Sequence, residues 1–189
     1  MRGRQKRAIL QVLLHPMTKK QLCLEAGRID PHIQLRDAWF VLRQFQKKGL
    51  VECLNPGQVT GKLFCLTEFG RKIVASAFKL KAPPLSPHVP WRKYSVVVRA
   101  KTRRMLVMEL GKFTSLNLGE ATATKIRKRL NQTYPIGLNP ILRSLKELVK
   151  LGLVKSVGVT KKQHRKIYQL TADGERIRQE LLSCWLNPA

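Results

Sequence analysis

One stretch of this sequence occurs twice, and the repeat limits what the chain can fold into. Residues 42–73 read LRQFQKKGLVECLNPGQVTGKLFCLTEFGRKI, and residues 145–177 read LKELVKLGLVKSVGVTKKQHRKIYQLTADGERI. Apolar and glycine positions coincide from Leu42 to Val51 at an offset of 103, and from Phe64 to Ile73 at an offset of 104. Self-similarity at a fixed offset dictates architecture, so the chain is predicted to be a tandem duplication of one small domain.

Both copies have the same predicted order of elements. An amphipathic helix ends at Gly49 or Gly152, because glycine adopts the left-handed C′ conformation at little cost. Two strands joined by a polar turn follow, and Thr67 or Thr171 then occupies the N-cap position of another helix. The predicted strands are 50–54 and 62–66 in the first copy, and 153–157 and 166–170 in the second.

Three short features recur in both copies: a Gly-Leu-Val triplet, an aromatic residue two positions before Leu-Thr, and a glycine three positions after that threonine. Together with the order helix, hairpin, helix, they resemble the C-terminal half of the bacterial and archaeal winged helix-turn-helix regulators. The resemblance covers most of the chain, twice. It implies an α+β, mostly α fold with two tandem winged helix-turn-helix domains, at 1–79 and 94–189, joined by a proline-rich linker at 80–93.

In the first domain, the second and third of four predicted helices form the helix-turn-helix. A capping box at Thr18 and Gln21 opens the second helix, which is expected to stop at Gly27. Asp30-Pro31 is expected to be an N-cap followed by proline at the first position of a third, recognition helix. A basic arm at 1–7 and a first helix at 8–14 are expected before the second helix. The third helix is expected to run to Lys48, with a core stripe of Leu35, Ala38, Leu42 and Phe45. A fourth helix is expected from Thr67 to about Lys79.

In the second domain the beginning is less clear than the end. Val96–Val98 is compatible with strand or helix, and a helix is expected from about Arg99. Asn139-Pro140 repeats the N-cap and proline pattern, and so predicts a second recognition helix over 140–151. Two further helices are expected, over 120–131 and 172–185.

The predicted linker has four prolines, at positions 83, 84, 87 and 90, and is therefore expected to be extended and semi-rigid. The stretch of 13 residues from about Lys79 to Trp91 would span roughly 40 Å at about 3.1 Å per residue. One turn of duplex, the usual separation of half-sites, is about 34–36 Å. A monomer is therefore expected to bind as a pseudo-dimer at an asymmetric site.

Charge is the strongest compositional signal. Thirty-seven Lys and Arg residues against eleven Asp and Glu residues give a formal net charge of +26, and both halves of the chain share the excess. A polyanionic partner, most commonly nucleic acid, accounts for such an imbalance. The sequence has no run of 18 apolar residues and no signal-peptide pattern, so no membrane partner is expected, and the protein is predicted to be cytoplasmic and nucleoid-associated.

Catalytic and metal-binding patterns are not expected. The four cysteines have no C-x-x-C spacing and the histidines do not cluster with them, so no metal and no cofactor is predicted. Cys53 and Cys65 are expected to lie opposite each other on the first hairpin, either as a redox pair or as two half-buried thiols. Paired carboxylates and a glycine-rich phosphate loop are lacking, so the chain is predicted not to be an enzyme.

The residues expected to bind DNA are basic or polar side chains on the recognition helices, the second helix of the second domain and the two hairpins. Arginine suits guanine edges and lysine suits phosphates. These residues are Arg36, Arg43, Lys47, Lys62, Lys125, Arg127, Lys128, Arg129, Asn139, Arg143, Lys146, Lys161, Lys162, His164, Arg165 and Lys166. Trp39 and Phe40 depart from the family's small polar residues, and are candidates for core packing, for contact with a base methyl or for a protein contact.

These observations predict a double-stranded DNA-binding protein, a transcriptional regulator that uses two recognition helices and basic wings. One alternative is an architectural chromatin or nucleoid protein with little sequence specificity. A second is a module for structured RNA, since tandem winged helices also bind RNA in the selenocysteine elongation-factor family. A third is a replication or recombination component that docks a protein through Trp39 and Phe40.

Overall fold

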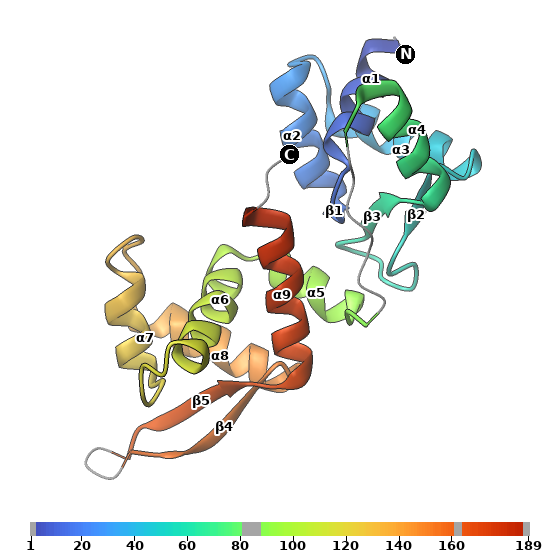
Figure 1. Cartoon of the computed structure of the whole chain (residues 1–189). Coiled ribbons are helices and arrows are strands. Elements are labelled where there is room, and N and C mark those ends of the chain that lie inside the picture. The colour runs from blue at the N-terminus through green and yellow to red at the C-terminus, as the bar shows by residue number, and fades with distance from the viewer. Residues whose placement is uncertain (1–2, 81–87, 161–163, 187–189) are drawn as a thin grey trace. The chain divides into compact units, whose positions relative to one another are not determined.

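The computed structural model describes residues 3–80, 88–160 and 164–186, with the side chains of the last helix described up to Ser183. The chain is α+β and mostly helical, with two small antiparallel sheets (Figure 1). It divides into two compact units: unit 1 holds the elements α1 to α4, and unit 2 holds α5 to α9. The prolines at 83, 84 and 87 of the predicted linker lie outside the described residues.

Unit 1 is a bundle of four helices closed by a three-stranded sheet. The sheet order is β1-β3-β2, so the central strand β3 pairs with β1 at Met17 and with β2 at Cys53, both opposite Phe64. The elements are α1 (Gly3–Val12), β1 (Met17–Thr18), α2 (Lys19–Ile29), α3 (Leu35–Lys47), β2 (Val51–Cys53), β3 (Leu63–Leu66) and α4 (Glu68–Phe78).

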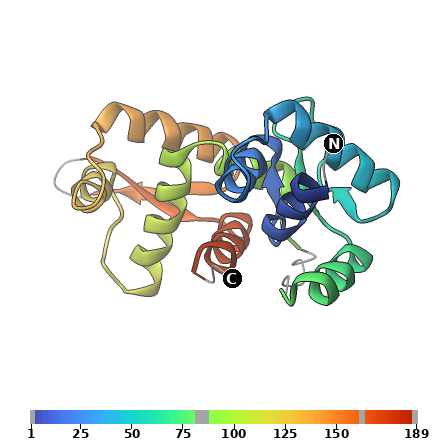
Figure 2. The same ribbon diagram turned by 90° about the horizontal axis from the view of Figure 1, so that it is seen from above.

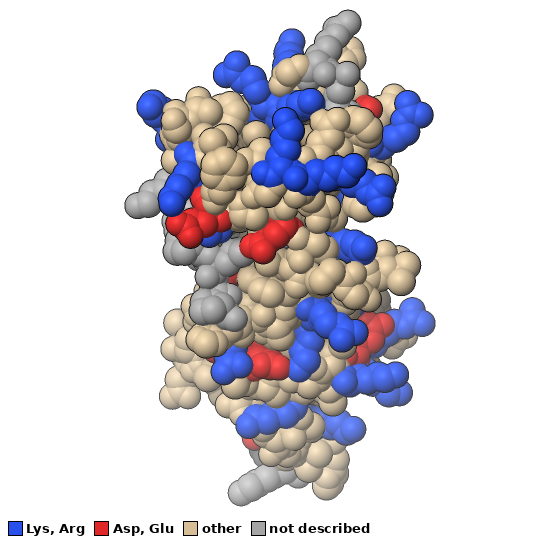
Figure 3. All heavy atoms as spheres, turned by 90° about the vertical axis from the view of Figure 1, so that its right-hand side faces the viewer, with Lys and Arg blue, Asp and Glu red and all other residues tan. Residues whose placement is uncertain are grey.

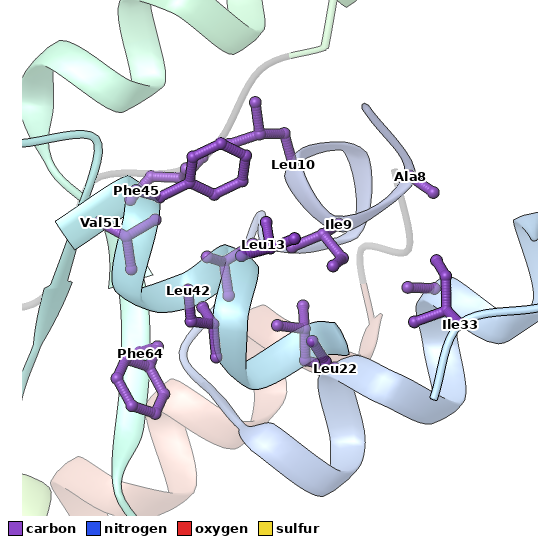
Figure 4. Close-up of a cluster of buried hydrophobic side chains, with 14 of the residues drawn as sticks. Ala8, Ile9, Leu10, Leu13, Leu22, Ile33, Leu42, Phe45, Val51 and Phe64 are labelled. Atoms are coloured by element: carbon purple, nitrogen blue, oxygen red, sulfur yellow. The ribbon is translucent and has the colours of Figure 1, made fainter. Parts of the chain in front are cut away.

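The core of unit 1 lies where the apolar faces of α1, α2 and α3 meet the sheet (Figure 4). Each fully buried leucine or isoleucine contributes about 1.5–3 kcal/mol relative to an exposed one, so this cluster supplies most of the driving force for folding. Buried members from these helices and from the sheet include Ile9, Leu13, Leu22, Leu42, Phe45, Val51 and Phe64.

Several predicted boundaries in unit 1 are wrong at the turn between α2 and α3. The helix α2 does not stop at Gly27 but continues to Ile29, and Asp30 is its C-cap, with the Asp30 N–H donating to Ala26. The helix α3 begins at Leu35, where the Gln34 N–H donates to the Asp37 carboxylate. Leu35 is consequently 44% exposed and is not a core residue.

Other predictions for unit 1 are confirmed or corrected in detail. The Thr18 capping box is present, because the Thr18 side chain and backbone exchange hydrogen bonds with Gln21. The predicted stripe of α3 is buried at Ala38, Leu42 and Phe45. Residues 3–7 are not an arm but the first turns of α1.

Unit 2 contains five helices and a long hairpin. The hairpin packs at its base against α6, α8 and α9, as Figure 2 shows from above. The elements are α5 (Trp91–Val98), α6 (Lys101–Ser115), α7 (Ala123–Leu130), α8 (Leu138–Lys150), β4 (Val154–Val159), β5 (Lys166–Leu170) and α9 (Ala172–Leu186).

The start of unit 2 differs from the prediction. Val96–Val98 is helical and belongs to α5, which begins at Trp91 and so shortens the predicted extended linker. The helix α5 is joined to α9 by an ion pair between Lys93 and Asp173, with an Nζ–Oδ2 distance of 2.6 Å. Asn139 is not an N-cap, because α8 begins at Leu138 after Gly137.

The structure extends the repeat to residues that the sequence alone does not align. Thr18 pairs with Leu63 in unit 1, and Thr122 bridges to Ile167 in unit 2, so both partners are shifted by 104. Thr122 also caps α7 by accepting a hydrogen bond from the Lys125 N–H, as Thr18 does for α2. The two units therefore share their helix caps and strand pairings, while α5 belongs to unit 2 alone.

The same hydrogen-bonded junction holds the end of α3 to α4, and the end of α8 to α9. In unit 1 the Thr67 hydroxyl donates to the Gly49 carbonyl at 2.6 Å and accepts from the Gly70 N–H at 3.0 Å. In unit 2 the Thr171 hydroxyl donates to Gly152 at 2.7 Å and accepts from Gly174 at 3.2 Å. The repeated Gly, Thr and Gly of the sequence therefore form the same hydrogen-bonded junction in both units.

The second glycine of this junction is required by space. A Cβ on Gly70 would lie 2.1 Å from the Leu50 carbonyl oxygen, and one on Gly174 would lie 2.1 Å from the Leu153 carbonyl oxygen. The first glycine is required by conformation, since Gly49 and Gly152 have φ values of 67° and 69°. Each motif glycine thus has its own physical reason.

Replacing Gly70 or Gly174 with alanine is expected to lower the free energy of unfolding by about 1–3 kcal/mol, because the new methyl group forces the backbone apart. Gly27→Ala in α2 is the matched control. A Cβ there meets nothing within 4 Å, so stability should stay the same or rise by about 0.5–1 kcal/mol. Urea unfolding followed by circular dichroism measures the stability of all three variants. If Gly27→Ala changed stability as much as the other two, the close approach at the junction would not be what requires glycine.

Candidate nucleic-acid interface

The outer face of α3 carries a line of exposed side chains at helical spacing. Arg36, Phe40, Arg43 and Lys47 follow one another at steps of four, three and four residues, and each is exposed. We call these four residues the α3 stripe. Such spacing places side chains on one face of a helix, so the stripe is a continuous surface.

The helix α8 carries the matching line. Asn139, Arg143, Lys146 and Lys150 lie at the same positions as the α3 stripe at the offset of 103, and all four are exposed. We call them the α8 stripe. None of the eight residues in the two stripes is acidic and six are basic. The acid of α8, Glu147, forms an ion pair with Arg103 of α6 at 3.5 Å.

Trp39 and Phe40 have different environments. The Trp39 ring is half-buried and meets Phe64 edge to face at a centroid distance of 6.1 Å. The Lys19 ammonium and the Arg43 guanidinium lie 5.4 and 5.2 Å from the Trp39 centroid, so two cations are held at this ring. Phe40, by contrast, is 52% exposed on the stripe itself. Trp39 is therefore part of the framework and Phe40 part of the surface.

The basic run on α7 is divided between surface and framework. Lys125, Arg127 and Lys128 are exposed. Arg129 instead forms an ion pair with Glu109 of α6, and its guanidinium lies 5.7 Å from the Phe113 centroid. Because the Glu109 side chain is almost completely buried, Arg129 compensates a buried charge, and we do not count it as part of the candidate interface.

The second hairpin extends beyond the helices of unit 2 (Figure 1). Its described basic residues, Lys155, Arg165 and Lys166, and the neighbouring His164 are exposed. The end of the hairpin is closed by hydrogen bonds from the Thr160 N–H to the Arg165 carbonyl and from the Arg165 N–H to the Thr160 hydroxyl, at 2.9 and 3.1 Å. The predicted contacts Lys161 and Lys162 lie outside the described residues.

The first hairpin is organised by a buried amide that the sequence analysis missed. Asn55 accepts a hydrogen bond from the Leu63 N–H at 2.7 Å and donates to Gln58 and to the Gly61 carbonyl. The loop is thereby closed, and it leaves Lys62 half-exposed. Asparagine before Pro-Gly is typical of a turn, and this is the signal that could have identified it.

The strand register corrects the cysteine prediction. Cys53 lies opposite Phe64, and Cys65 lies opposite Glu52, so the two thiols are one position out of register and on opposite faces. Burial, reinforced by the neighbouring Glu52, raises the pKa of the Cys65 thiol. A cross-strand redox pair is therefore not supported.

Most acidic side chains are occupied within the molecule. Ion pairs hold Glu25, Asp30, Glu68, Glu109, Glu147, Asp173 and Glu175, and hydrogen bonds from Lys93 to Asp173 and from Arg178 to Glu175 lower the pKa of each carboxyl group. No ion pair among the described residues uses a basic residue of either stripe. On the face drawn in Figure 3, Lys and Arg spread widely while Asp and Glu form small separate groups.

Within the described ranges, no group of three or more His, Cys, Asp and Glu residues is placed to hold a metal ion. None of the helices in that part of the chain is both long and apolar enough to cross a membrane. No protein-family model matches the chain, and no curated protein matches it either.

Replacing Arg129 with alanine should lower the free energy of unfolding by about 1–3 kcal/mol, because it leaves the buried Glu109 carboxylate with Lys112 as its remaining ion-pair partner. The exposed neighbour Arg127 is the control, and Arg127→Ala should change stability by less than about 0.5 kcal/mol. Urea unfolding of both variants distinguishes the two roles. If the Arg129 variant were as stable as the Arg127 variant, the structural role of Arg129 would be refuted and it would again count as a candidate interface residue.

Proposed function

We propose that this chain is a double-stranded DNA-binding protein with two tandem winged helix-turn-helix domains, and that it acts as a transcriptional regulator. The order of elements supports the fold: in each unit a helix, a short strand or bridge, two helices, a hairpin and a final helix follow one another. The observation that carries the function is the pair of exposed, acid-free stripes at equivalent positions of α3 and α8.

The mechanism would be non-covalent. In this proposal the α8 stripe enters a major groove, where Arg143 is suited to a bidentate contact with guanine and Asn139 to one with adenine. Exposed cations on α7 and on the second hairpin would contact phosphates, and these contacts release counterions and position the stripe without reading sequence. The +26 charge would also favour association with any polyanion.

The same charge favours a second candidate, an architectural nucleoid protein with little sequence specificity. The two differ in what the stripes do, because an architectural protein would use Arg143 as one more phosphate contact. Competition among a preferred duplex, unrelated duplexes and structured RNA separates these candidates. If structured RNA displaces bound duplex more effectively than any competing duplex does, the RNA-binding alternative is favoured instead.

Binding to duplex DNA should depend steeply on salt. If about 8 to 10 phosphates are neutralised, the logarithm of the binding constant should fall against the logarithm of salt concentration with a slope of about −7 to −9. Fluorescence anisotropy at several salt concentrations measures this slope. A slope shallower than about −3 would show that the charge does not serve a polyanion.

Two variants should separate base reading from phosphate contact. Arg143→Ala should cost about 1–3 kcal/mol on a preferred duplex and less on others, because a base contact is lost. Replacing Lys161, Lys162, Arg165 and Lys166 together with alanine should weaken binding to every duplex and flatten the salt slope by roughly 2 to 4.

The control for both is Lys72→Ala on α4, where Lys72 pairs with Glu68 at 3.0 Å and lies outside the proposed interface. This variant should bind like the parent. An equal loss on all duplexes for Arg143→Ala would favour the architectural protein over the regulator.

A further inference from the structure

We propose that unit 1 binds an unpaired nucleobase, stacked on the Phe40 ring, so that the two units take different forms of nucleic acid. The inference rests on the proposed function, because it also takes nucleic acid as the ligand. It goes further in assigning single-stranded nucleic acid to the α3 stripe. The starting observation is that Phe40 occupies the position that Arg143 occupies in unit 2.

The environment of Phe40 is that of an aromatic platform between cations. Arg36 lies four residues before it and Arg43 three residues after it, which puts both about 5–6 Å away between Cβ atoms on one helix face. The ring is 52% exposed. Arg43 is held in place by its contact with the Trp39 ring, so one cation beside the platform is preorganised. Lys47 continues the same face.

One carboxylate, three residues before Phe40, lies close to this face, against the three cations of the stripe. Asp37, the acid of α3, accepts a hydrogen bond from the Gln34 backbone at the start of the helix. The charge of the stripe is therefore complementary to a phosphate chain, while its centre offers an apolar ring. Aromatic rings flanked by cations are the elements with which proteins hold single strands, because every base has a face for stacking.

The chemistry of phenylalanine favours an unpaired base over a paired one. The ring has no hydrogen-bonding group, so it cannot read donors and acceptors on base edges as Arg143 can. Inside a duplex the base faces are covered by their neighbours, and only edges are open in the groove. A ring on a helix therefore stacks on a base at the lowest cost where that base has already left the duplex, as in a single strand.

The test compares three ligands for the full-length chain by fluorescence anisotropy. These are a blunt duplex of about 20 base pairs, the same duplex with a ten-nucleotide single-stranded tail, and the same tailed duplex with abasic sites throughout the tail. The abasic tail keeps the phosphates and removes the bases, so the difference between the two tails measures what the bases contribute. A change in the fluorescence of a 2-aminopurine in the tail, lost in Phe40→Leu, reports that this base changes its stacking at the ring.

The parent chain should bind the base-containing tail about five- to 150-fold more tightly than the abasic tail, as expected for one stacked base. Phe40→Leu keeps an apolar side chain and should lose most of this difference, whereas Phe40→Tyr keeps the ring and should retain it. Phe69→Leu on α4 is the matched control, because Phe69 is 55% exposed but lies outside the stripe, and it should behave as the parent does.

Three results would overturn the inference. Equal affinity for the two tails would show that no base is stacked. Equal behaviour of Phe40→Leu and Phe40→Tyr would assign the ring to an apolar contact, such as a protein surface. A loss on the blunt duplex when thymine is replaced by uracil, confined to chains with Phe40, would assign it to a thymine methyl. Salt-dependent binding of the blunt duplex separates any of these from failure of the proposed function.

Discussion

The threonine hydroxyl that joins two helix ends fixes the geometry on which each unit depends. By donating to the glycine carbonyl at the end of α3, Thr67 ties that helix to the start of α4, and Thr171 does the same for α8 and α9. The strand that follows the glycine must then leave in one direction, because Leu50 and Leu153 also accept a hydrogen bond from the threonine N–H. The stripe and the hairpin are therefore held in one orientation by a junction of a few residues.

The sequence predicts the glycine and the threonine cap of this junction because each is local and occurs twice, but it does not predict the hydrogen bond that joins them across 18 residues. Gly49, Thr67 and Gly70 each have a conformational or spatial requirement that few other residues meet, and repetition at a fixed offset distinguishes the pattern from chance. The turn between α2 and α3 is predicted poorly, since Asp30-Pro31 is equally suited to opening one helix or closing another. Packing decides the matter, because Asp30 is buried as a C-cap.

The sequence predicts that the candidate interface is basic, but not which of its basic residues are exposed and which pair with buried acids. Arg127 and Arg129 are alike in the sequence, yet the buried Glu109 of another helix takes Arg129 and leaves Arg127 exposed. Likewise, counting from the centre of the first hairpin puts Cys53 opposite Cys65. Asn55 closes the loop asymmetrically and shifts the pairing by one residue. The first error comes from a contact between residues 20 apart, which no local pattern predicts, whereas the second comes from a turn residue whose local signal was overlooked.

The differences between the units follow from the same logic. Equivalent positions on α3 and α8 share a backbone frame, so exchanging arginine for phenylalanine changes the chemistry of the surface without changing its shape. Unit 1 compensates by fixing Arg43 and Lys19 at Trp39, which keeps positive charge beside an apolar ring. Unit 2 has its three cations at the consecutive stripe positions Arg143, Lys146 and Lys150, and the acid of α8, Glu147, pairs with Arg103. Two units with the same backbone frame can therefore carry surfaces of different chemistry while each stripe retains three cations.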